Sequence, residues 1–303
     1  MTTTLFSIVL PVLTFLAVAL VSGNNLSTCV GPAIGARILS PRSGILLAAT
    51  GFCLGLLIQG PHMITSTHML LPNPTAQLQS EALLVAIVIF VIADIIRIPI
   101  SLSMSLVGLL VGLSVARNMP VSSSYLTTVI AMWFVAPAIA MAGAFYFTKM
   151  VNRTSPKNIW RRIQTFEIVL IALSFTASYV LGANTLGLIV ATGGFSVLTI
   201  VAAIAAIFVG SIFLSAGEIR RVSQELFLMR YPNATVSLLI STLFIELATL
   251  LNIPLSNTQT LSSAVFGAGF SYRARYISLK PFMIILIGWI IAPLLSFAIG
   301  LVI

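Results

Sequence analysis

Two short stretches of the chain carry hydroxyl side chains directly after a proline, in matching patterns. Residues 98–103 read Ile-Pro-Ile-Ser-Leu-Ser, and residues 253–258 read Ile-Pro-Leu-Ser-Asn-Thr. Proline suits the first position of a helix, because its missing N–H would be unsatisfied there anyway. Each stretch therefore predicts a helix that begins at Pro99 or Pro254 and carries hydroxyls in its first turn. The free N–H groups and the positive dipole end of such a helix favour an anion.

A second pair of polar segments precedes these stretches in the same order. Residues 23–25 read Gly-Asn-Asn, and residues 182–184 read Gly-Ala-Asn. Only about a dozen residues separate the first of these from the next loop, which is too few to cross a bilayer. We therefore predict a re-entrant half-helix there, with Ser27 or Thr28 as a cap. One such segment alone could be an ordinary kink or helix contact, but its duplication favours a binding role.

These features belong to a repeat that covers most of the chain. Residues 23–137 return as residues 182–293, at an offset of about 155–160 positions. We predict one membrane repeat over residues 1–148, a basic connector over 149–162, and a second repeat over 163–303.

The composition is that of a polytopic membrane protein. Apolar residues make up 59% of the chain, charged residues 7%, and the mean hydropathy is +1.13. A soluble domain would carry about a quarter charged residues. We predict an all-α fold, and the runs long enough to span a bilayer lie at 4–22, 44–60, 82–98, 121–148, 164–181, 195–215, 234–251 and 281–303.

The basic residues predict the orientation of the two repeats. The net charge of +9 comes from loop clusters, a distribution that argues against a nucleic-acid partner. Matching loops differ, because residues 60–80 contain no Lys or Arg and residues 218–232 contain three Arg. Cytoplasmic loops collect basic residues, so equivalent loops lie on opposite sides of the cell membrane. We therefore predict inverted repeats, a cytoplasmic connector at 149–162 and both termini outside.

Three charged residues in the apolar runs are candidates for ion coupling or for the substrate pathway. Asp94 lies five positions before Pro99, and Glu246 lies eight before Pro254. An ionisable group at membrane depth is costly, so a role in proton coupling is a natural hypothesis for both. Arg97 could attract the anion through its guanidinium. The alternatives are an ion pair between Asp94 and Arg97 and an ordinary helix contact for Glu246.

The order of these motifs resembles the PiT-type inorganic phosphate transporters over nearly the whole chain. In both halves a Gly-(Ala/Asn)-Asn segment precedes Pro-x-Ser-x-(Ser/Thr), and residues 265–269 (Val-Phe-Gly-Ala-Gly) resemble that family's Gly-x-Gly ending. The resemblance implies a dimeric secondary transporter that holds a tetrahedral oxyanion at the ends of broken helices. The substrate-binding residues that it implies here are Asn25, Ser101, Ser103, Asn184, Ser256 and Thr258.

The chain departs from the sodium-coupled members of that family. Those members carry Asp directly after the Asn of each break, where this chain has Leu26 and Thr185. A hard cation needs oxygen ligands and charge balance, so the usual sodium site is not expected. The sulfate-permease branch also lacks these aspartates, which makes sulfate as strong a candidate as phosphate and favours proton coupling. Two Cys and two His without metal-ligand spacing predict no metal and no cofactor.

The predicted function is therefore a membrane permease, not an enzyme. It would carry sulfate or phosphate with protons by alternating access, as a homodimer in the lipid bilayer. An anion channel of the same architecture is the alternative, since the sequence separates the two poorly. An integral membrane enzyme is disfavoured, because the chain lacks a cluster of acids and bases at one membrane face.

Overall fold

The structure is a computed structural model that describes residues 2–96, 100–153, 158–215, 231–273 and 280–303. Every regular element within these ranges is a helix, as expected where backbone groups must hydrogen-bond within their own segment. The helices of the first half are α1 (Thr2–Gly35), α2 (Pro41–Ile58), α3 (His62–Leu70), α4 (Ala76–Ile95), α5 (Leu102–Ala116) and α6 (Ser123–Arg153). Those of the second half are α7 (Ile159–Leu181), η1 (Gly182–Leu186), α8 (Gly187–Thr192), α9 (Val197–Val209), η2 (Gly210–Leu214), α11 (Tyr231–Leu250), α12 (Asn257–Arg273) and α13 (Lys280–Val302).

Each of the eight predicted spans overlaps a helix, and seven helices within the described ranges are long and apolar enough to cross a membrane. Many of their large apolar side chains are exposed, such as Phe134 at 63% and Val197 at 79%. A lipid environment accounts for that exposure, because hydrocarbon chains replace the protein core as the apolar partner. The chain is a multi-pass membrane protein.

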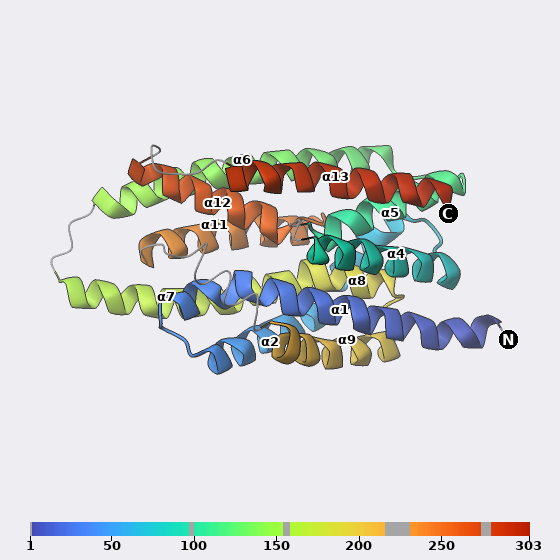
Figure 1. Ribbon diagram of the computed structural model, residues 1–303, viewed down its shortest axis with the longest axis horizontal. Coiled ribbons are helices and arrows are strands. Elements are labelled where there is room, and N and C mark those ends of the chain that lie inside the picture. The colour runs from blue at the N-terminus through green and yellow to red at the C-terminus, as the bar shows by residue number, and fades with distance from the viewer. Residues whose placement is uncertain (1, 97–99, 154–157, 216–230, 274–279) are drawn as a thin grey trace.

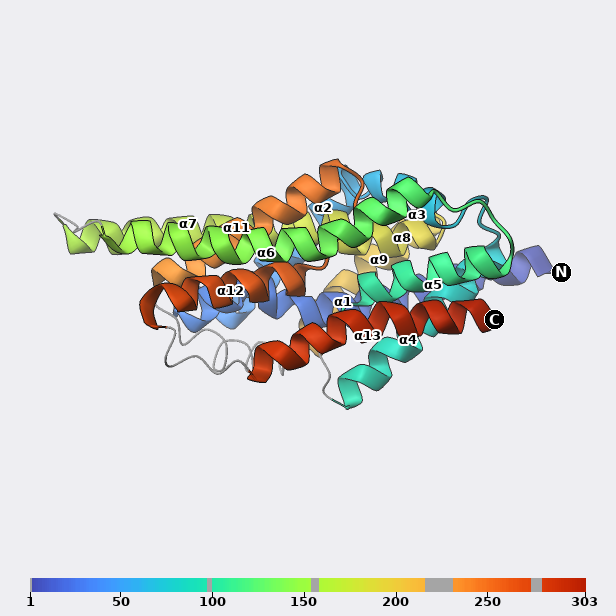
Figure 2. The ribbon, with the colours of Figure 1, turned by 90° about the horizontal axis from the view of Figure 1, so that it is seen from above.

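Equivalent helices of the two halves run in opposite directions. In Figure 1, α1 runs away from the end where both termini lie, whereas α7, η1 and α8 run toward it. Helices α5 and α12 both begin near the middle of the molecule and run to opposite ends (Figures 1 and 2). The predicted all-α fold with two inverted repeats is confirmed.

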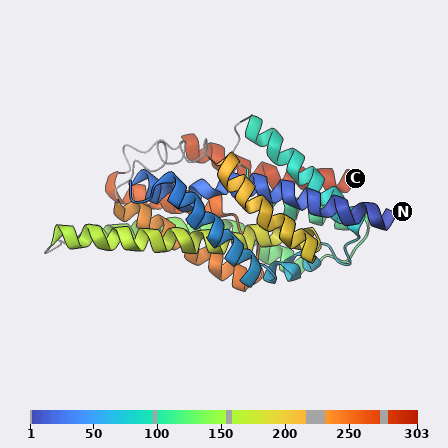
Figure 3. The same cartoon turned by 90° about the horizontal axis from the view of Figure 1, so that it is seen from below.

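The helices form layers along the long axis of the molecule. Helices α6 and α13 lie at one face, and α2 and α9 lie at the opposite face, where α9 crosses α1 (Figures 1 and 3). Helices α1 and α7 lie between them and contact each other. Helix also extends into both ends of the predicted 149–162 connector, since α6 reaches Arg153 and α7 begins at Ile159.

The predicted re-entrant turn near residue 25 is wrong in the first half. Helix α1 continues without a break to Gly35, and its 34 residues span about 51 Å. The hydroxyls of Ser27 and Thr28 do not cap a new helix, because they donate back to the carbonyls of Asn24 and Asn25 at 3.0 and 2.7 Å. The helix continues because the residues after the polar segment are buried against other helices, and Leu26 is fully buried.

In the second half the break takes a different form. Residues 182–186 form a π-helical segment between α7 and α8, and the chain continues in the same direction. A π segment widens the helix locally and re-aims its side chains, which is why such segments are frequent at functional sites. All five residues of η1 are buried. The Gly-Ala-Asn sequence therefore predicted an irregular position correctly, but the chain does not turn back there.

The last helix of each repeat packs against the other repeat. Helix α12 lies along α6, and α13 lies along α5. Close backbone approach makes both contacts possible, because a Cβ on Gly267 would come within 1.9 Å of the Met141 carbonyl oxygen. A Cβ on Gly112 would come within 2.4 Å of the Phe297 carbonyl oxygen in the same way. Small residues at helix contacts are typical of membrane proteins, where close packing replaces the hydrophobic effect.

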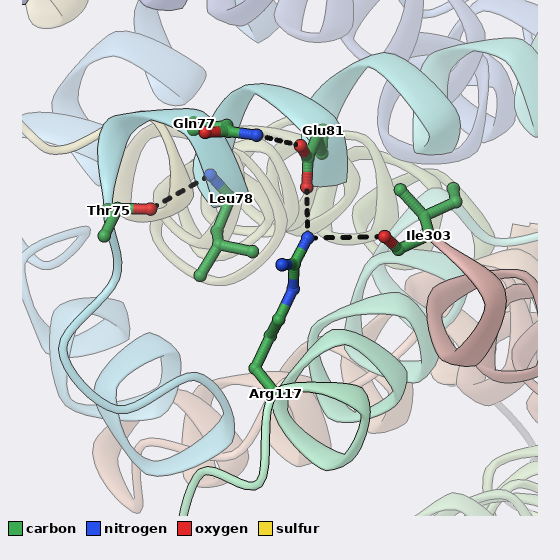
Figure 4. Close-up of polar contacts among 6 residues, drawn as sticks. All are labelled: Thr75, Gln77, Leu78, Glu81, Arg117 and Ile303. Atoms are coloured by element: carbon green, nitrogen blue, oxygen red, sulfur yellow. Dashed lines mark hydrogen bonds and ion pairs between the residues drawn. The ribbon is translucent and has the colours of Figure 1, made fainter.

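A polar cluster joins three helices at the end where the termini lie. The Arg117 guanidinium lies 4.0 Å from a Glu81 carboxylate oxygen and donates to the Ile303 carbonyl oxygen at 3.3 Å (Figure 4). Gln77 donates to the same carboxylate at 2.8 Å. These contacts tie the start of α4 and the end of α5 to the end of α13. An ion pair as exposed as this one contributes little to stability.

The close α6–α12 contact makes a testable prediction about folding. We expect Gly267→Ala to force the two helices apart and to destabilise the protein by about 1–3 kcal/mol. The matched control is Gly143→Ala on α6, where a Cβ would meet Ile240 at an ordinary 3.7 Å. Thermal unfolding in detergent should show a lower midpoint for the first variant only. Equal midpoints for the two variants would contradict the packing described here.

Candidate functional site

The segment between α11 and α12 is non-helical backbone, and its residues 253–256 are buried. The helix was expected to begin at Pro254, but α11 ends at Leu250 and α12 begins at Asn257. The first half repeats this pattern, because α5 begins at Leu102 with Ser101 as its N-cap residue. Both α5 and α12 therefore begin three residues after Pro99 and Pro254, where the sequence predicted their starts. We call residues 251–256 the α11–α12 linker.

The Asn184 amide satisfies the backbone of this linker. Its Oδ1 accepts a hydrogen bond from the Leu255 N–H, and its Nδ2 donates to the Ile253 carbonyl, both at 3.0 Å. The same Nδ2 donates to Thr249 Oγ1 at 3.0 Å. Asn184 is fully buried, so its three polar partners take the place of water. Asn184 therefore acts as a clamp on the linker in this structure, although it was predicted to bind substrate.

Side chains from the first half hold the rest of the linker. Trp133 Nε1 on α6 donates to the Pro254 carbonyl at 3.0 Å. The hydroxyls of Ser66 and Tyr125 both donate to the Asn252 carbonyl. These bonds explain why α12 does not start at the proline, since the linker carbonyls already have partners outside any helix.

The predicted hydroxyls form the same contact at both helix starts. Ser101 and Ser103 share a hydrogen bond of 2.8 Å at the start of α5, and Ser256 and Thr258 share one of 2.9 Å at the start of α12. Ser256 also accepts from the Gln259 N–H at 3.4 Å. Because α5 and α12 run in opposite directions from this region, their positive dipole ends converge there (Figure 1). The prediction that hydroxyls lie at two converging helix starts is consistent with this geometry.

A small polar cavity lies between the two helix starts. Its volume is about 10 Å³, which is about the space of one water molecule. Three predicted residues, Asn25, Ser101 and Thr258, line it. Ser103 and Ser256 are hydrogen-bonded to lining residues, whereas Asn184 is not part of the lining. The full lining is Asn25, Phe90, Ile100, Ser101, Leu102, Thr185, Asn257 and Thr258.

Sequence reasoning missed Thr185 and Asn257 as lining residues and Thr28 as the residue that supports Asn257. Thr185 and Asn257 line the cavity, and Asn257 Nδ2 donates to Thr28 Oγ1 at 2.9 Å. That bond connects the start of α12 to the middle of α1. Both missed lining residues adjoin predicted ones in the sequence, so attention to the neighbouring polar positions of each motif would have found them.

The positions where sodium-coupled relatives would carry Asp are neutral here. Leu26 is fully buried, and Thr185 adds a hydroxyl to the cavity lining. Neither residue can balance the charge of a bound cation.

Two of the charged candidates, Asp94 and Glu246, lie outside the cavity lining. Asp94 is exposed at the end of α4. Glu246 lies on α11, where its Oε1 accepts a hydrogen bond of 2.7 Å from Gln59 Nε2. Arg97 lies outside the residues that the structure describes. The roles of these three residues remain predictions.

A much larger hollow of about 630 Å³ lies between α5, α6, α12 and α13, and it differs in chemistry. Its lining is apolar apart from Gln259 and Ser263, and it includes Trp133 and Trp289. An inorganic anion would lose its hydration there without gaining hydrogen bonds, so this hollow does not suit one. The small cavity is the candidate site because polar groups surround it.

Comparison with known proteins identifies the family. The chain matches the sequence model of the "Phosphate transporter family" twice, over residues 21–172 and 154–300. The chain belongs to the phosphate transporter family. The double match fits the two repeats described above.

Individual members of the phosphate transporter family are distant in sequence. A protein of Methanocaldococcus jannaschii named "Putative phosphate permease" is 22% identical over 299 residues, which cover 96% of this chain and 95% of that protein. A Helicobacter pylori protein with the same description is 26% identical over 176 residues, or 52% of this chain and 32% of that protein. The fold is similar to a solved structure titled "The sodium-dependent phosphate transporter", with a TM-score of 0.83 at 16% identity, covering 100% of this chain and 99% of that one.

The two asparagines at equivalent family positions should respond differently to mutation. Asn184→Ala leaves the buried Leu255 N–H and Ile253 carbonyl without partners, and each loss costs about 1–3 kcal/mol. We expect its thermal unfolding midpoint to fall by roughly 6 °C or more. Asn25→Ala is the matched variant, since the Asn25 amide makes no side-chain hydrogen bond to the described residues.

Asn25→Ala should therefore keep the wild-type midpoint within about 2 °C. The measurement is thermal unfolding of both purified variants in the same detergent. A wild-type midpoint for Asn184→Ala would show that its amide is not a structural clamp.

Proposed function

We propose that the protein is a secondary transporter for a tetrahedral inorganic oxyanion. Phosphate is the preferred candidate for its substrate. The observation that carries the proposal is the meeting of two helix starts, one from each inverted repeat, at a cavity lined by hydroxyls and amides. Asn25, Ser101, Ser103, Ser256 and Thr258 would bind the anion. Thr185 and Asn257 also line the cavity and join them as candidates. Membership of a transporter family supports this reading over an enzyme.

The chemistry of the site suits an anion that arrives fully charged. Two helix N-termini supply free N–H groups and positive dipole ends, and the hydroxyls add donors without a fixed positive charge. Such a site can release its anion again, as a carrier must. The cavity of about 10 Å³ is too small for an oxyanion of five heavy atoms, so the helix starts must separate before the anion enters. Such movement is expected if the two halves expose the site alternately to each side.

Family membership favours phosphate, and one observation keeps sulfate as a second candidate. No carboxylate lines the described cavity, so its lining offers no strong hydrogen-bond acceptor for the proton that phosphate carries at neutral pH. The hydroxyl and amide oxygens can accept that proton in a hydrogen bond, which accommodates phosphate. Sulfate brings no such proton and needs donors only.

Proton coupling is the proposed source of energy. The neutral pair Leu26 and Thr185 disfavours a sodium ion, and Asp94, Arg97 and Glu246 are the candidate groups for coupling or for the pathway. The proposal predicts uptake that saturates, follows an inward proton gradient and proceeds without sodium. A channel would instead show a large passive conductance.

Proteoliposome uptake tests the function and the site together. Labelled phosphate should accumulate when the outside is more acidic, and parallel assays with labelled sulfate decide between the two anions. The double variant Ser103→Ala with Thr258→Ala should reduce uptake to background, because each helix start loses its shared hydroxyl contact. Ser105→Ala is the control on α5, since its buried hydroxyl has no partner among the described residues and lies outside the lining.

Undiminished transport in the double variant would refute the site. Uptake that required sodium and ignored pH would refute the proposed coupling. Accumulation of sulfate without phosphate would favour the second candidate.

We also propose that the end carrying both termini faces outward. The opposite end holds the α1–α2 turn with Arg37 and Arg42, and the α6 and α7 ends with Arg153 and Arg161 (Figure 1). Basic residues of this kind favour the cytoplasm. An epitope tag at the N-terminus should be removed by protease added to intact cells, whereas protection of the tag would reverse the orientation.

The homodimer implied by the resemblance is part of the same proposal. Light scattering of the detergent-solubilised protein should give a protein mass of twice 32.3 kDa, and a mass of one chain would contradict it.

A further inference from the structure

An amide–carboxyl contact joins two helices from different halves of the protein. Gln59 is the C-cap residue of α2, and its Nε2 donates to Glu246 Oε1 on α11 at 2.7 Å. The backbones next to this pair also approach each other closely, because a Cβ on Gly187 would come within 2.9 Å of Gly60 Cα. The end of α2 is therefore held tightly against the second repeat at this point.

The two remaining oxygens of this pair have no hydrogen-bond partner among the described residues. Glu246 Oε2 and Gln59 Oε1 are both buried and make no hydrogen bond within the described part of the chain. The ion pair that the structure describes joins Arg117 and Glu81 and lies elsewhere. No described basic side chain lies within 4.0 Å of the Glu246 carboxyl. Tyr179 on α7 is the described ionisable group that interacts with it electrostatically. An ionised Glu246 would place two acceptors and an unbalanced negative charge together, which is costly away from water.

A protonated Glu246 removes both difficulties. A carboxylic acid offers one O–H donor and one carbonyl acceptor, and a primary amide offers a matching N–H and carbonyl. We propose that the Gln59–Glu246 pair is the proton-binding site of the transporter, with the proton on Glu246 Oε2 donated to Gln59 Oε1. The proton comes from water on one side of the membrane and leaves to water on the other, and no other bond changes. This inference rests on the proposed proton-coupled transport and names the group that carries the proton.

The pair is connected to the anion site through α11. Thr249 lies one turn after Glu246, accepts from Asn184 Nδ2 at 3.0 Å and donates to the Ile245 carbonyl. Asn184 in turn holds the α11–α12 linker at Leu255. Loss of the proton would leave two buried acceptors without a donor at the contact between α2 and α11 and would weaken this contact. Proton binding and the clamped linker therefore favour each other, and by linkage each strengthens the other.

Glu246→Gln tests the assignment, because glutamine keeps the shape and both hydrogen bonds of the acid but cannot release a proton. Exchange of labelled phosphate for unlabelled phosphate needs no net proton movement and should stay within about twofold of wild type. Accumulation driven by a pH gradient should be lost, whereas wild type can gain about tenfold per pH unit for each coupled proton. Glu167→Gln on α7 is the matched control and should behave as wild type in both assays.

Infrared difference spectra between acidic and basic pH give a readout that does not depend on transport. Wild type should show the carbonyl band of a buried protonated carboxylic acid, and Glu246→Gln should lack it. A band of equal strength in both proteins would overturn the assignment.

The outcomes separate this inference from the proposed function. Wild-type accumulation in Glu246→Gln would overturn the proton site and leave the transporter intact. Loss of both exchange and accumulation at wild-type thermal stability would show that Glu246 positions other groups, which also overturns it. If transport required sodium and did not depend on pH, Glu246 Oε2 and Gln59 Oε1 would be assigned to binding a cation instead of a proton. Failure of the wild-type protein to move phosphate or sulfate in either assay would overturn the proposed function itself.

Discussion

The organisation of the protein depends on one constraint, which is that non-helical backbone in a membrane interior needs partners within the protein. The α11–α12 linker meets this constraint through side chains from three other elements: the Asn184 amide from η1, the Trp133 indole from α6 and the Ser66 hydroxyl from α3. Each of these bonds occupies a backbone group that would otherwise continue a helix. The linker can therefore end one helix and begin another where an anion would bind. Removal of water from the region makes each of these bonds more important than it would be at a surface.

The two halves share the arrangement of hydroxyls and differ in how their first helix is built. The hydroxyl pairs at the starts of α5 and α12 have nearly the same length, 2.8 and 2.9 Å. In contrast, α1 is a continuous α-helix, whereas its counterpart contains the π segment that places Asn184 on the linker and Thr185 in the cavity. The duplicated sequence thus supplies matching donors, and the second half supplies the clamp. The proposed proton site is also asymmetric, because the position of α4 that matches Glu246 on α11 is Val91.

Hydropathy, duplication and basic-residue counts predicted the spans, the inverted order and the hydroxyl-bearing helix starts, because those signals are local in the sequence. The continuity of α1 was not predictable in this way. It depends on burial of Leu26 and its neighbours against helices that come much later in the chain. The late start of α12 was missed for a related reason, since Trp133 and Asn184 must be in place before the linker carbonyls and amides have partners. Tertiary contacts of the same kind give Asn184, an expected ligand, its bonds to the linker, and Asn257 its bond to Thr28.

The reciprocal packing of the last helices has a consequence for biosynthesis. The ribosome completes α6 long before α12, its main partner, and α5 likewise precedes α13. The faces of α5 and α6 that contact these helices must therefore remain covered by lipid or by other membrane proteins until α12 and α13, near the end of the polypeptide, insert. A chain interrupted before α12 would leave those faces unmatched and prone to wrong pairing, which makes it a natural target for membrane quality control.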